Sequence, residues 1–567
     1  MGTDILITGS VLAVLFILYS IMAASRRANL LNRRRKIERE WGNVPDREYV
    51  SGELENIARY YQNKLKRQEE KSHVIDDITW NDLDMDRVFC MLNRTYSSVG
   101  QEYLYYMLRT PEMSEENMQE RERLIRHFAE AKTVRTELQM QYFEIGRTKK
   151  VSICDYIQTL ESLKPKSNMP HYLSIFIFLL CAVGCFLNPA VGFLVLLADI
   201  GGNIRVYYKQ RGEIEPYIVT FTHLIRMLKA GERISRIEDN EISSYINEIR
   251  EIRKSFGAFQ KKSGWIAGGD KMSGSALDVF ADYIRMLFHI DLIVFNQMLG
   301  EVQKKSREIY RLMDLLGILE AHIAIASYRE SLPFYVLPEF LENQGTELEA
   351  EDVYHPMIRE PVANTIQTKK GVLITGSNAS GKSTFLKTIA INGILAQTIH
   401  TCLAHTYRTN FFRVYSSMAL RDDLDSQESY YIVEIKSLKR ILNATNQGGP
   451  ILCFIDEVLR GTNTVERIAA SAQILKSLAG NNVLCFAATH DIELTQMLEA
   501  DYDNYHFQEE IVENDILFDY ILYPGRATSR NAIRLLGMIG YDEEIIRRAD
   551  ATAEEFLKSG EWILAES

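Results

Sequence analysis

One loop, between residues 371 and 384, constrains the fold of this chain most. The apolar run "GVLIT" leads into "GSNASGKST", and the helical pattern "FLKTIAINGILA" follows. Gly376, Gly381, Lys382 and Ser383 match the spacing G-x-x-x-x-G-K-[ST]. Glycine lets such a loop turn its backbone N–H groups towards a phosphate, and the helix that follows adds its positive end. The sequence therefore predicts a strand, a phosphate-binding loop and a helix.

The loop assigns candidate ligands for ATP and Mg²⁺. Lys382 is expected to reach the β- and γ-phosphates, and the Ser383 hydroxyl is expected to hold Mg²⁺. The predicted nucleotide-binding residues are Gly376, Ser377, Asn378, Ala379, Ser380, Gly381, Lys382, Ser383 and Thr384.

Two further apolar runs end in polar residues. "ILCFIDE" (451–457) delivers Asp456 to the carboxyl end of a predicted strand, where open parallel sheets bind their ligands. Asp456 is expected to hold Mg²⁺ through water, and Glu457 to orient or deprotonate the attacking water. "NVLCFAATHD" ends at His490, which could sense the γ-phosphate. Lys382, Glu457 and His490 are the predicted catalytic residues.

The N-terminus carries a candidate membrane anchor. Ile5 to Ala24 is 20 residues without a charge, the length that a spanning helix needs. Arginines 26, 27, 33, 34 and 35 follow it, whereas a signal peptide carries its positive charge before the apolar core. This pattern predicts an uncleaved anchor with its C-terminal side in the cytoplasm. Nucleic-acid binding by the basic run is the weaker alternative.

A second apolar stretch runs from Tyr172 to Leu197 and is interrupted by Asn188-Pro189. A single span would place everything downstream outside the cell, away from cytoplasmic nucleotide. We therefore predict two helices in a tight hairpin that turns at Asn188-Pro189, with the second helix running on towards Tyr208. Buried helices of a soluble domain, or an interfacial element, are the alternatives.

The rest of the chain reads as helices followed by alternating strands and helices. Residues 37–165 and 209–335 show helical periodicity, and short β-branched runs alternate with helices from 371 onward, as in a parallel sheet. The net charge of −11 gives no global basic surface for nucleic acid. The seven cysteines form no CxxC or Cys/His cluster, so they read as buried thiols in a reducing compartment.

Residues 351–560 resemble the ATPase domain of the MutS family, within the ABC-type ATPases. The matching segments, in order, are "YHPMI", "TGSNASGKSTFLKTI", "DDLDSQESYYIVEIKSLKRIL", "IDEVLRGTNTVERIA", "ATHDIELT" and "YPGRATSRNAIRLLGMIGYDEEIIRRADA". The resemblance aligns Ser429 with the serine that reaches the γ-phosphate held by a partner subunit, and Glu434 with a family glutamate. Residues 92–111 and 312–338 resemble, more weakly, the start and return of the family's helical core and lever.

The sequence also departs from the family pattern. Ala379-Ser380 stands where the family usually has Met-Gly, and Gln427-Glu428 replaces Gly-Arg before Ser429, where the composite site closes. No mismatch-reading domain is recognisable at the N-terminus, and three predicted membrane spans are foreign to the soluble repair proteins.

The predicted architecture is a C-terminal α/β P-loop ATPase domain, preceded by an all-α lever and core domain that a transmembrane hairpin interrupts. An N-terminal transmembrane helix comes first. The expected bounds are 1–25 for the anchor, 26–80 for a basic juxtamembrane helical region, 81–168 and 209–345 for the two parts of the helical core, 169–208 for the hairpin, and 346–567 for the ATPase domain with its dimerisation helices.

The resemblance implies an ATP hydrolase with two composite sites in a homodimer, in a multi-pass protein of the cell membrane whose ATPase domain is cytoplasmic. The helical arms are expected to bind DNA, in mismatch repair or recombination. Lysines in "RKSFGAFQKKSGW" (253–265) are the candidate backbone contacts. The alternative is a membrane-embedded ATP switch that acts on a protein or on the bilayer, with no DNA role. A transporter subunit ranks lowest, because an LSGGQ-type segment is missing before residue 451.

Overall fold

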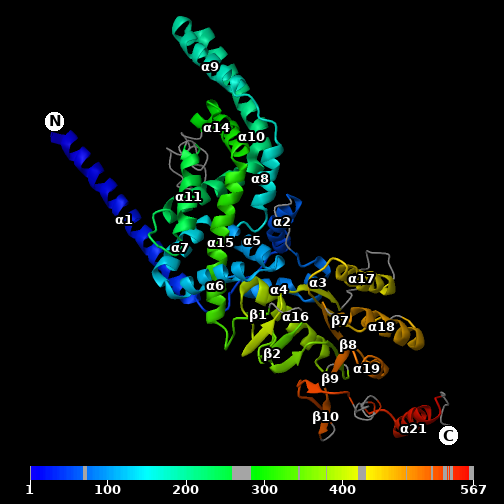
Figure 1. Cartoon of the computed structure of the whole chain (residues 1–567). Coiled ribbons are helices and arrows are strands. Elements are labelled where there is room, and N and C mark those ends of the chain that lie inside the picture. Colours follow the sequence, from blue (N-terminus) through cyan, green and yellow to red (C-terminus); the bar gives the residue numbers. More distant parts are fainter. Residues whose placement is uncertain are drawn as a thin grey trace. The chain divides into compact units, whose positions relative to one another are not determined.

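The computed structural model forms two compact units (Figure 1). The helical unit comprises Met1–Glu70, Met91–Tyr106 and Glu122–Ser331, and the sheet unit comprises Lys71–Cys90, Met107–Arg121 and Leu332–Ser567. The structure describes residues 2–67, 73–257, 259, 283–341, 345–377, 380–418, 430–460, 462–480, 482–512, 515–527, 533, 536 and 540–560.

The helical unit is built from long helices packed on one another. Helix α15 (Ser306–Glu330) is buried along nearly its whole length and lies in the core of this unit. The other helices of this unit are α1 (Gly2–Glu40), α2 (Glu53–Lys66), α7 (Lys132–Ile145), α8 (Ile153–Ser162), α9 (Met169–Leu187), α10 (Pro189–Ile234), α11 (Ser243–Ser255) and α14 (Ile290–Lys304). Helices α4 (Met85–Leu92), α5 (Ser98–Arg109) and α6 (Glu115–Glu130) contribute residues to both units.

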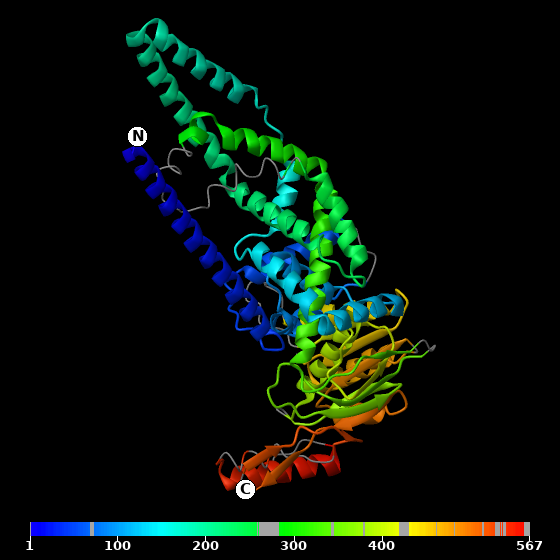
Figure 2. The same ribbon diagram turned by 90° about the vertical axis from the view of Figure 1, so that its left-hand side faces the viewer.

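Helices α9 and α10 form an antiparallel hairpin that turns where the sequence predicts it (Figure 2). Asn188 lies between them, and its side chain accepts a hydrogen bond from the Val191 N–H at 3.3 Å. Pro189 occupies the first position of α10, which suits its fixed φ and missing N–H. In the described part of the chain, Met169–Leu187 and Pro189–Glu215 are the two helical segments long and apolar enough to cross a bilayer.

Two of the predicted boundaries fall inside continuous helices. Helix α10 passes through residue 208 without a break and ends at Ile234, so the hairpin and the following core segment share one helix of 46 residues. Helix α1 likewise passes residue 25 and ends at Glu40. Of the apolar run in α1, the side chains of Phe16, Ile17 and Ile21 are described, and each is exposed. The domain bounds themselves stay predictions.

The sheet unit is centred on a six-stranded sheet with the order β12-β9-β4-β8-β7-β6. All neighbouring pairs are parallel except β12 with β9. Strands β4, β7 and β8 are buried at every position, as expected for strands covered on both faces. The strands of this sheet are β4 (Gly371–Thr375), β6 (Arg413–Ser417), β7 (Ile451–Asp456), β8 (Val483–Ala488), β9 (Tyr502–His506) and β12 (Tyr523–Pro524).

The remaining elements of the sheet unit surround this central sheet. A second sheet has the order β1-β5-β2-β3, and β10 pairs with β11 in a hairpin. These strands are β1 (Glu339–Phe340), β2 (Leu348–Val353), β3 (Asn364–Thr368), β5 (Thr406–Thr409), β10 (Glu509–Val512) and β11 (Asp515–Phe518). The helices are α3 (Asp77–Asp82), α16 (Lys382–Ile399), α17 (Tyr430–Thr445), α18 (Thr464–Leu478), α19 (Ile492–Met497) and α21 (Glu543–Ser559).

A segment remote in sequence is built into the sheet unit beside β6. The Asp82 carboxylate accepts hydrogen bonds from the Ser416 hydroxyl at 2.7 Å and the Met418 N–H at 3.0 Å. Thr79 accepts a further bond from the Ser416 N–H at 3.1 Å. The helix α3 therefore belongs structurally to the C-terminal domain, more than 300 residues away along the chain.

Candidate nucleotide site

The parallel register brings the predicted site residues to one edge of the sheet. Ile374 of β4 and Asp456 of β7 both pair with Ala488 of β8, so the three strands end at the same level. The residues that follow them are the phosphate loop, Glu457 and Thr489-His490. The carboxyl edge of the sheet thus gathers three motifs that lie up to 115 residues apart in the sequence.

The loop between β4 and α16 has the shape that its glycines predict. Gly376 has φ 147° and Gly381 has φ 110°. A Cβ atom on Gly376 would lie 2.9 Å from the Phe507 carbonyl oxygen, so no side chain fits there. Lys382 Nζ donates to the carbonyl oxygens of Gly376 at 2.8 Å and Ser377 at 2.7 Å, and it lies across the loop mouth. Burial lowers the pKa of Lys382, while the charge of Asp456 opposes that shift.

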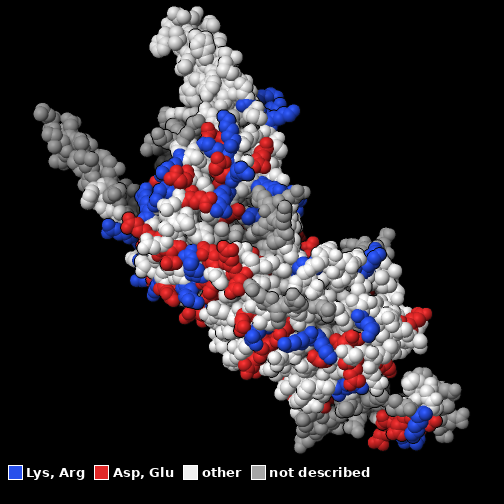
Figure 3. Space-filling model, viewed as in Figure 1, with Lys and Arg blue, Asp and Glu red and all other residues white. Residues whose placement is uncertain are grey.

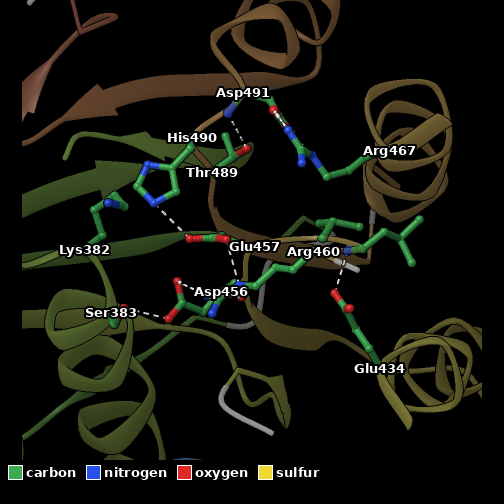
Figure 4. A network of polar contacts seen from close by, with 12 residues as sticks. Lys382, Ser383, Glu434, Asp456, Glu457, Arg460, Arg467, Thr489, His490 and Asp491 are labelled. Atoms are coloured by element: carbon green, nitrogen blue, oxygen red, sulfur yellow. Dashed lines mark hydrogen bonds and ion pairs between the residues drawn. The ribbon is translucent and has the colours of Figure 1, made fainter. Parts of the chain in front are cut away.

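The two predicted magnesium residues are in direct contact. The Ser383 hydroxyl donates a hydrogen bond to Asp456 Oδ2 at 2.6 Å (Figure 4). Asp456 is largely buried, and its backbone carbonyl accepts a bond from Arg460 Nη2 at 3.1 Å. Hydroxyl and carboxylate oxygens are the hard donors that Mg²⁺ prefers.

Glu457 is held at both carboxylate oxygens. His490 Nε2 lies 2.9 Å from Glu457 Oε1, and Arg460 Nε lies 2.7 Å from Oε2. The bond from His490, followed by the charge of Arg460, lowers the pKa of Glu457. The backbone of Glu457 is left-handed, with φ 64°, a strained conformation for a non-glycine residue that fixes the direction of its side chain. Glu457 is therefore an oriented carboxylate at neutral pH.

The residues around this group hold it in place. Asp491 accepts two bonds from Arg467 of α18, at 2.6 and 3.0 Å, and its N–H donates to Thr489 Oγ1 at 3.0 Å (Figure 4). Glu434 of α17 accepts a hydrogen bond from the Leu459 N–H, and burial raises the pKa of Glu434. Helix α17 thus fixes the turn that carries Glu457 and Arg460, and helix α18 fixes the segment that carries His490.

A cavity of about 700 Å³ lies over the loop. The loop, Asp456 and Glu457 form one part of its lining, and a less polar group of residues forms another part. That second group includes His355, Ile358, Val362, Phe507 and Tyr520.

Not every predicted site residue can be placed. Gly376, Ser377, Ser380, Gly381, Lys382, Ser383 and Thr384 are described, and all except Gly376 and Ser380 line the cavity. The Ser380 hydroxyl is buried and has no hydrogen-bond partner among the described residues. Asn378, Ala379 and Ser429 lie outside the described residues, as does most of the lysine-bearing segment 253–265.

Sequence reasoning missed several contacts of the site. Ser377 donates to Glu509 of β10 at 2.7 Å, and Tyr520 and Phe507 line the cavity from more than 120 residues downstream. No local sequence pattern identifies Glu509, Tyr520 or Phe507 as residues of the site. The ion pair between Glu457 and Arg460 could have been predicted from the sequence, because residues three apart in a turn face each other.

The comparisons with known proteins match the part of the chain that carries this site. The family model for MutS domain V matches residues 372–557. This stretch is therefore similar to domain V of the MutS family. It is 31% identical over 268 residues to MutS protein homolog 4 of Mus musculus, covering 44% of this chain and 27% of that protein. It is 27% identical over 263 residues to the DNA mismatch repair protein MutS of Thermus aquaticus, covering 46% of this chain and 32% of that protein.

A longer match includes part of the chain before the sheet unit. The DNA mismatch repair protein MutS of Leptospira interrogans is 26% identical over 341 residues, covering 57% of this chain and 40% of that protein. The chain thus spans about a quarter to two fifths of the length of these MutS relatives. The predicted resemblance to the MutS family is confirmed.

Proposed function

We propose that the chain is a membrane-anchored MutS-family ATPase. It binds ATP and Mg²⁺ at the carboxyl edge of the six-stranded sheet and hydrolyses ATP there. The observation that carries the proposal is the contact of Ser383 with Asp456, next to the Glu457–His490 pair, beside a cavity that Ser383, Asp456 and Glu457 line. These four residues come from the ends of two strands, β7 and β8, and from the first turn of α16.

The residues fit the nucleotide and its metal. The cavity of about 700 Å³ is within the range of small-molecule sites. The loop ends at the N-terminus of α16, and within the described residues Lys382 donates only to loop carbonyl groups, which phosphate oxygens can replace. Ser383 and Asp456 offer adjacent oxygen ligands. Mg²⁺, when bound, would neutralise part of the phosphate charge.

The protein's own residues position the attacking water. Glu457 is ionised and oriented, so it can accept a proton from a water in the cavity. His490 orients that carboxylate from the end of β8. Lys382 lines the same cavity as Glu457 and would stabilise phosphate charge there. Arg460 competes for the second oxygen of Glu457, so its release would free that oxygen for water.

We propose two composite sites in a homodimer, with Ser429 of each subunit completing the site of the other. The similarity to domain V of the MutS family and the position of α17, whose residue Glu434 contacts the Glu457 turn, support this arrangement. The preceding segment would then carry Ser429 towards the partner.

We place the protein in the cell membrane as a multi-pass protein with the ATPase domain in the cytoplasm. The α9–α10 hairpin supports this placement, because its side chains are apolar and exposed. Phe186 is 90% exposed and Leu187 is 85% exposed. Figure 3 shows the arm of α9 as a surface free of charged side chains, with lysines and arginines at its base. A water-exposed arm of this kind would be unstable, whereas a bilayer would cover it.

DNA is the ligand that we propose for the helical arms, since two of the three relatives reported above are named DNA mismatch repair proteins. The second candidate is an ATP switch that acts on a protein or on the bilayer. The exposed hairpin favours it, because an arm fixed in a membrane is poorly suited to encircling a duplex.

The test is the ATPase rate of detergent-purified protein, with and without matched, mismatched and branched DNA duplexes. Lys382→Ala is the blank. Glu457→Gln keeps the shape of the side chain but removes its basicity, and we expect about 100-fold slower hydrolysis. Hydrolysis that persists in both variants would refute the proposed site. Stimulation by DNA that is lost at high salt supports the DNA role, whereas a rate indifferent to every duplex supports the switch.

A further inference from the structure

The helical unit contains a second cavity, of about 580 Å³, which we call the arginine pocket. Its lining comes from the end of α1 and the loop after it, from residues 93–96, and from the end of α7. Five cationic side chains and three carboxylates line it. The cations are Lys36, Arg47, Arg94, Arg147 and Lys149, and the carboxylates are Glu40, Asp46 and Glu48.

The three arginines of the pocket are half-buried, whereas Lys36, Lys149 and two of the carboxylates are exposed to solvent. Asp46 and Glu48 are exposed to solvent. Glu40 is occupied, because it accepts a bond from the Tyr96 hydroxyl at 2.8 Å and faces Lys36 at 3.7 Å. These carboxylates therefore do little to neutralise the arginines.

Arg147 is the least satisfied of the three arginines. In the described residues its guanidinium forms no ion pair and no hydrogen bond, and its Nε atom is buried. Burial, followed by the nearby charge of Arg47, lowers the pKa of Arg147 to about 10, while the charge of Glu320 opposes that shift. A guanidinium has five N–H donors, and burying them without acceptors is costly.

Arg94 and Arg47 also keep donors unused. Arg94 donates to the Ser327 carbonyl and to the Ser331 hydroxyl, but it has no carboxylate partner among the described residues, and its Nε is buried without an acceptor. Arg47 uses only Nη2, for Glu53 and Gln101, and leaves Nε and Nη1 buried and unpartnered. Arg147 thus lines the cavity with a guanidinium that has no protein acceptor among the described residues, beside two further guanidinium groups whose remaining donors are buried.

The backbone holds Arg147 in position. The Gly146 carbonyl accepts a bond from the Ser98 N–H at 3.1 Å, and the Thr148 N–H donates to Ser98 Oγ at 2.8 Å. Both neighbours of Arg147 are therefore fixed to the same residue of α5. The fixed backbone therefore holds the Arg147 side chain at the pocket, although it has no ion pair there.

We propose that the arginine pocket binds a soluble organic phosphate of nucleotide size. Guanidinium groups bind phosphate oxygens in a bidentate manner, which would satisfy the unused donors. The rings of Trp41, Tyr96 and Phe143 line the same cavity and would contact a planar group. The volume suits such a ligand.

A phospholipid headgroup offers the same phosphate, but the position of the pocket favours a soluble molecule. If α1 is anchored through Ile5–Ala24, Lys36 lies 12 residues beyond the apolar run, or about 18 Å along the helix. The headgroup layer on one side of a bilayer is only about 5–8 Å thick.

The experiment measures binding to full-length protein in detergent by calorimetry. Every variant carries Lys382→Ala, so that the phosphate loop contributes little. The probes are AMP, inorganic pyrophosphate and uncharged adenosine, with phosphatidylglycerol–phosphatidylcholine vesicles as the lipid arm. We expect AMP or pyrophosphate to bind saturably and adenosine to bind at least about tenfold more weakly.

Arg147→Met should weaken phosphate binding at least about tenfold, and Arg147→Lys should restore part of it. Arg236→Met, an exposed arginine on the same unit, is the matched control and should bind like the parent. Without probe, Arg147→Met should melt no lower than the parent, because it removes an unpaired buried cation; a purely structural arginine would give a lower melting temperature.

Three results would overturn the proposal. The first is that neither AMP nor pyrophosphate binds. The second is that binding is indifferent to Arg147→Met. The third is Arg147-dependent binding to the vesicles without binding to either soluble phosphate, which would assign the pocket to lipid instead. If Arg147→Met fails to fold, the Arg147→Lys variant decides by the same comparison.

Discussion

The Ser383 hydroxyl and the Asp456 carboxylate are joined by a hydrogen bond of 2.6 Å, which links the first turn of α16 to the end of β7. Asp456→Asn keeps the shape but weakens the ligand set for Mg²⁺. We expect the apparent affinity for Mg²⁺ in the ATPase assay to fall roughly 10–100-fold, as for other residues that orient a metal's ligands. Excess Mg²⁺ should restore part of the rate. A variant with unchanged magnesium dependence would exclude Asp456 from the metal site.

The bond from His490 to Glu457 predicts a change in the pH dependence of hydrolysis. Glu457 acts as a base only when ionised, and the His490 bond lowers its pKa. Removing that bond in His490→Ala raises this pKa, so the rate should begin to fall at a higher pH as the solution is acidified. The pH–rate profile of the variant, at saturating ATP, checks this shift. An unchanged acidic limb would show that another group controls it.

Glu320 predicts a pH dependence of stability in the helical unit. It is 1% exposed and accepts bonds from the Tyr96 and Ser97 N–H groups and the Ser97 hydroxyl. Burial nevertheless raises its pKa from 4.5 to about 7. A carboxyl group with a raised folded-state pKa favours folding below pH 4.5, and this contribution is lost as the pH rises towards 7. Glu320→Gln should therefore raise the melting temperature relative to the parent more at pH 8 than at pH 5. Equal shifts at both values would contradict the assignment.

Gly100 is required by a close approach to the same residue. A Cβ atom there would overlap the Glu320 carboxylate. Gly100→Ala should lower the free energy of unfolding by roughly 1–3 kcal/mol, the usual effect of overpacking. Gly300→Ala in α14 is the matched control, because its Cβ would meet no atom within 4 Å and alanine favours helix. Denaturant unfolding compares them, and equal stability of the two variants would refute the prediction.

The hairpin predicts a labelling pattern in intact cells. A cysteine in place of Asn188, at the turn, should react with a membrane-impermeable maleimide added outside. Cysteines in place of Lys166 and Lys209, at the two ends of the hairpin, should react only after permeabilisation. The parent, with its own seven cysteines, gives the baseline. Labelling of all three positions from the same side would contradict a transmembrane hairpin.

The strands and turns of the site were predictable because they are local. Each buried strand is a short run of β-branched and apolar residues, and the loop glycines mark the positions of positive φ. Asn188-Pro189 likewise marks its turn by chemistry that depends on two adjacent residues. The meeting of Ser383, Asp456 and Glu457 follows from one rule about parallel sheets.

The rest depends on contacts between distant segments. Nothing near Asp82 in the sequence indicates that it binds Ser416, and nothing near Glu509 indicates that it binds Ser377. The end of α10 could not be predicted either. Its apolar segment continues through Tyr208 into an amphipathic segment, and no proline or capping residue marks a boundary at that point. The arginine pocket leaves no motif, since its three arginines come from three separate segments.

The unbroken course of α10 has a mechanical consequence. A helix of 46 residues is about 69 Å long, and its ladder of backbone hydrogen bonds is interrupted only where Pro216 has no N–H to donate. If the hairpin crosses a bilayer as we propose, lipid surrounds the first part of this helix, so a rotation of α10 would have to deform lipid. Membrane tension and bilayer thickness would then enter the energy of that motion directly.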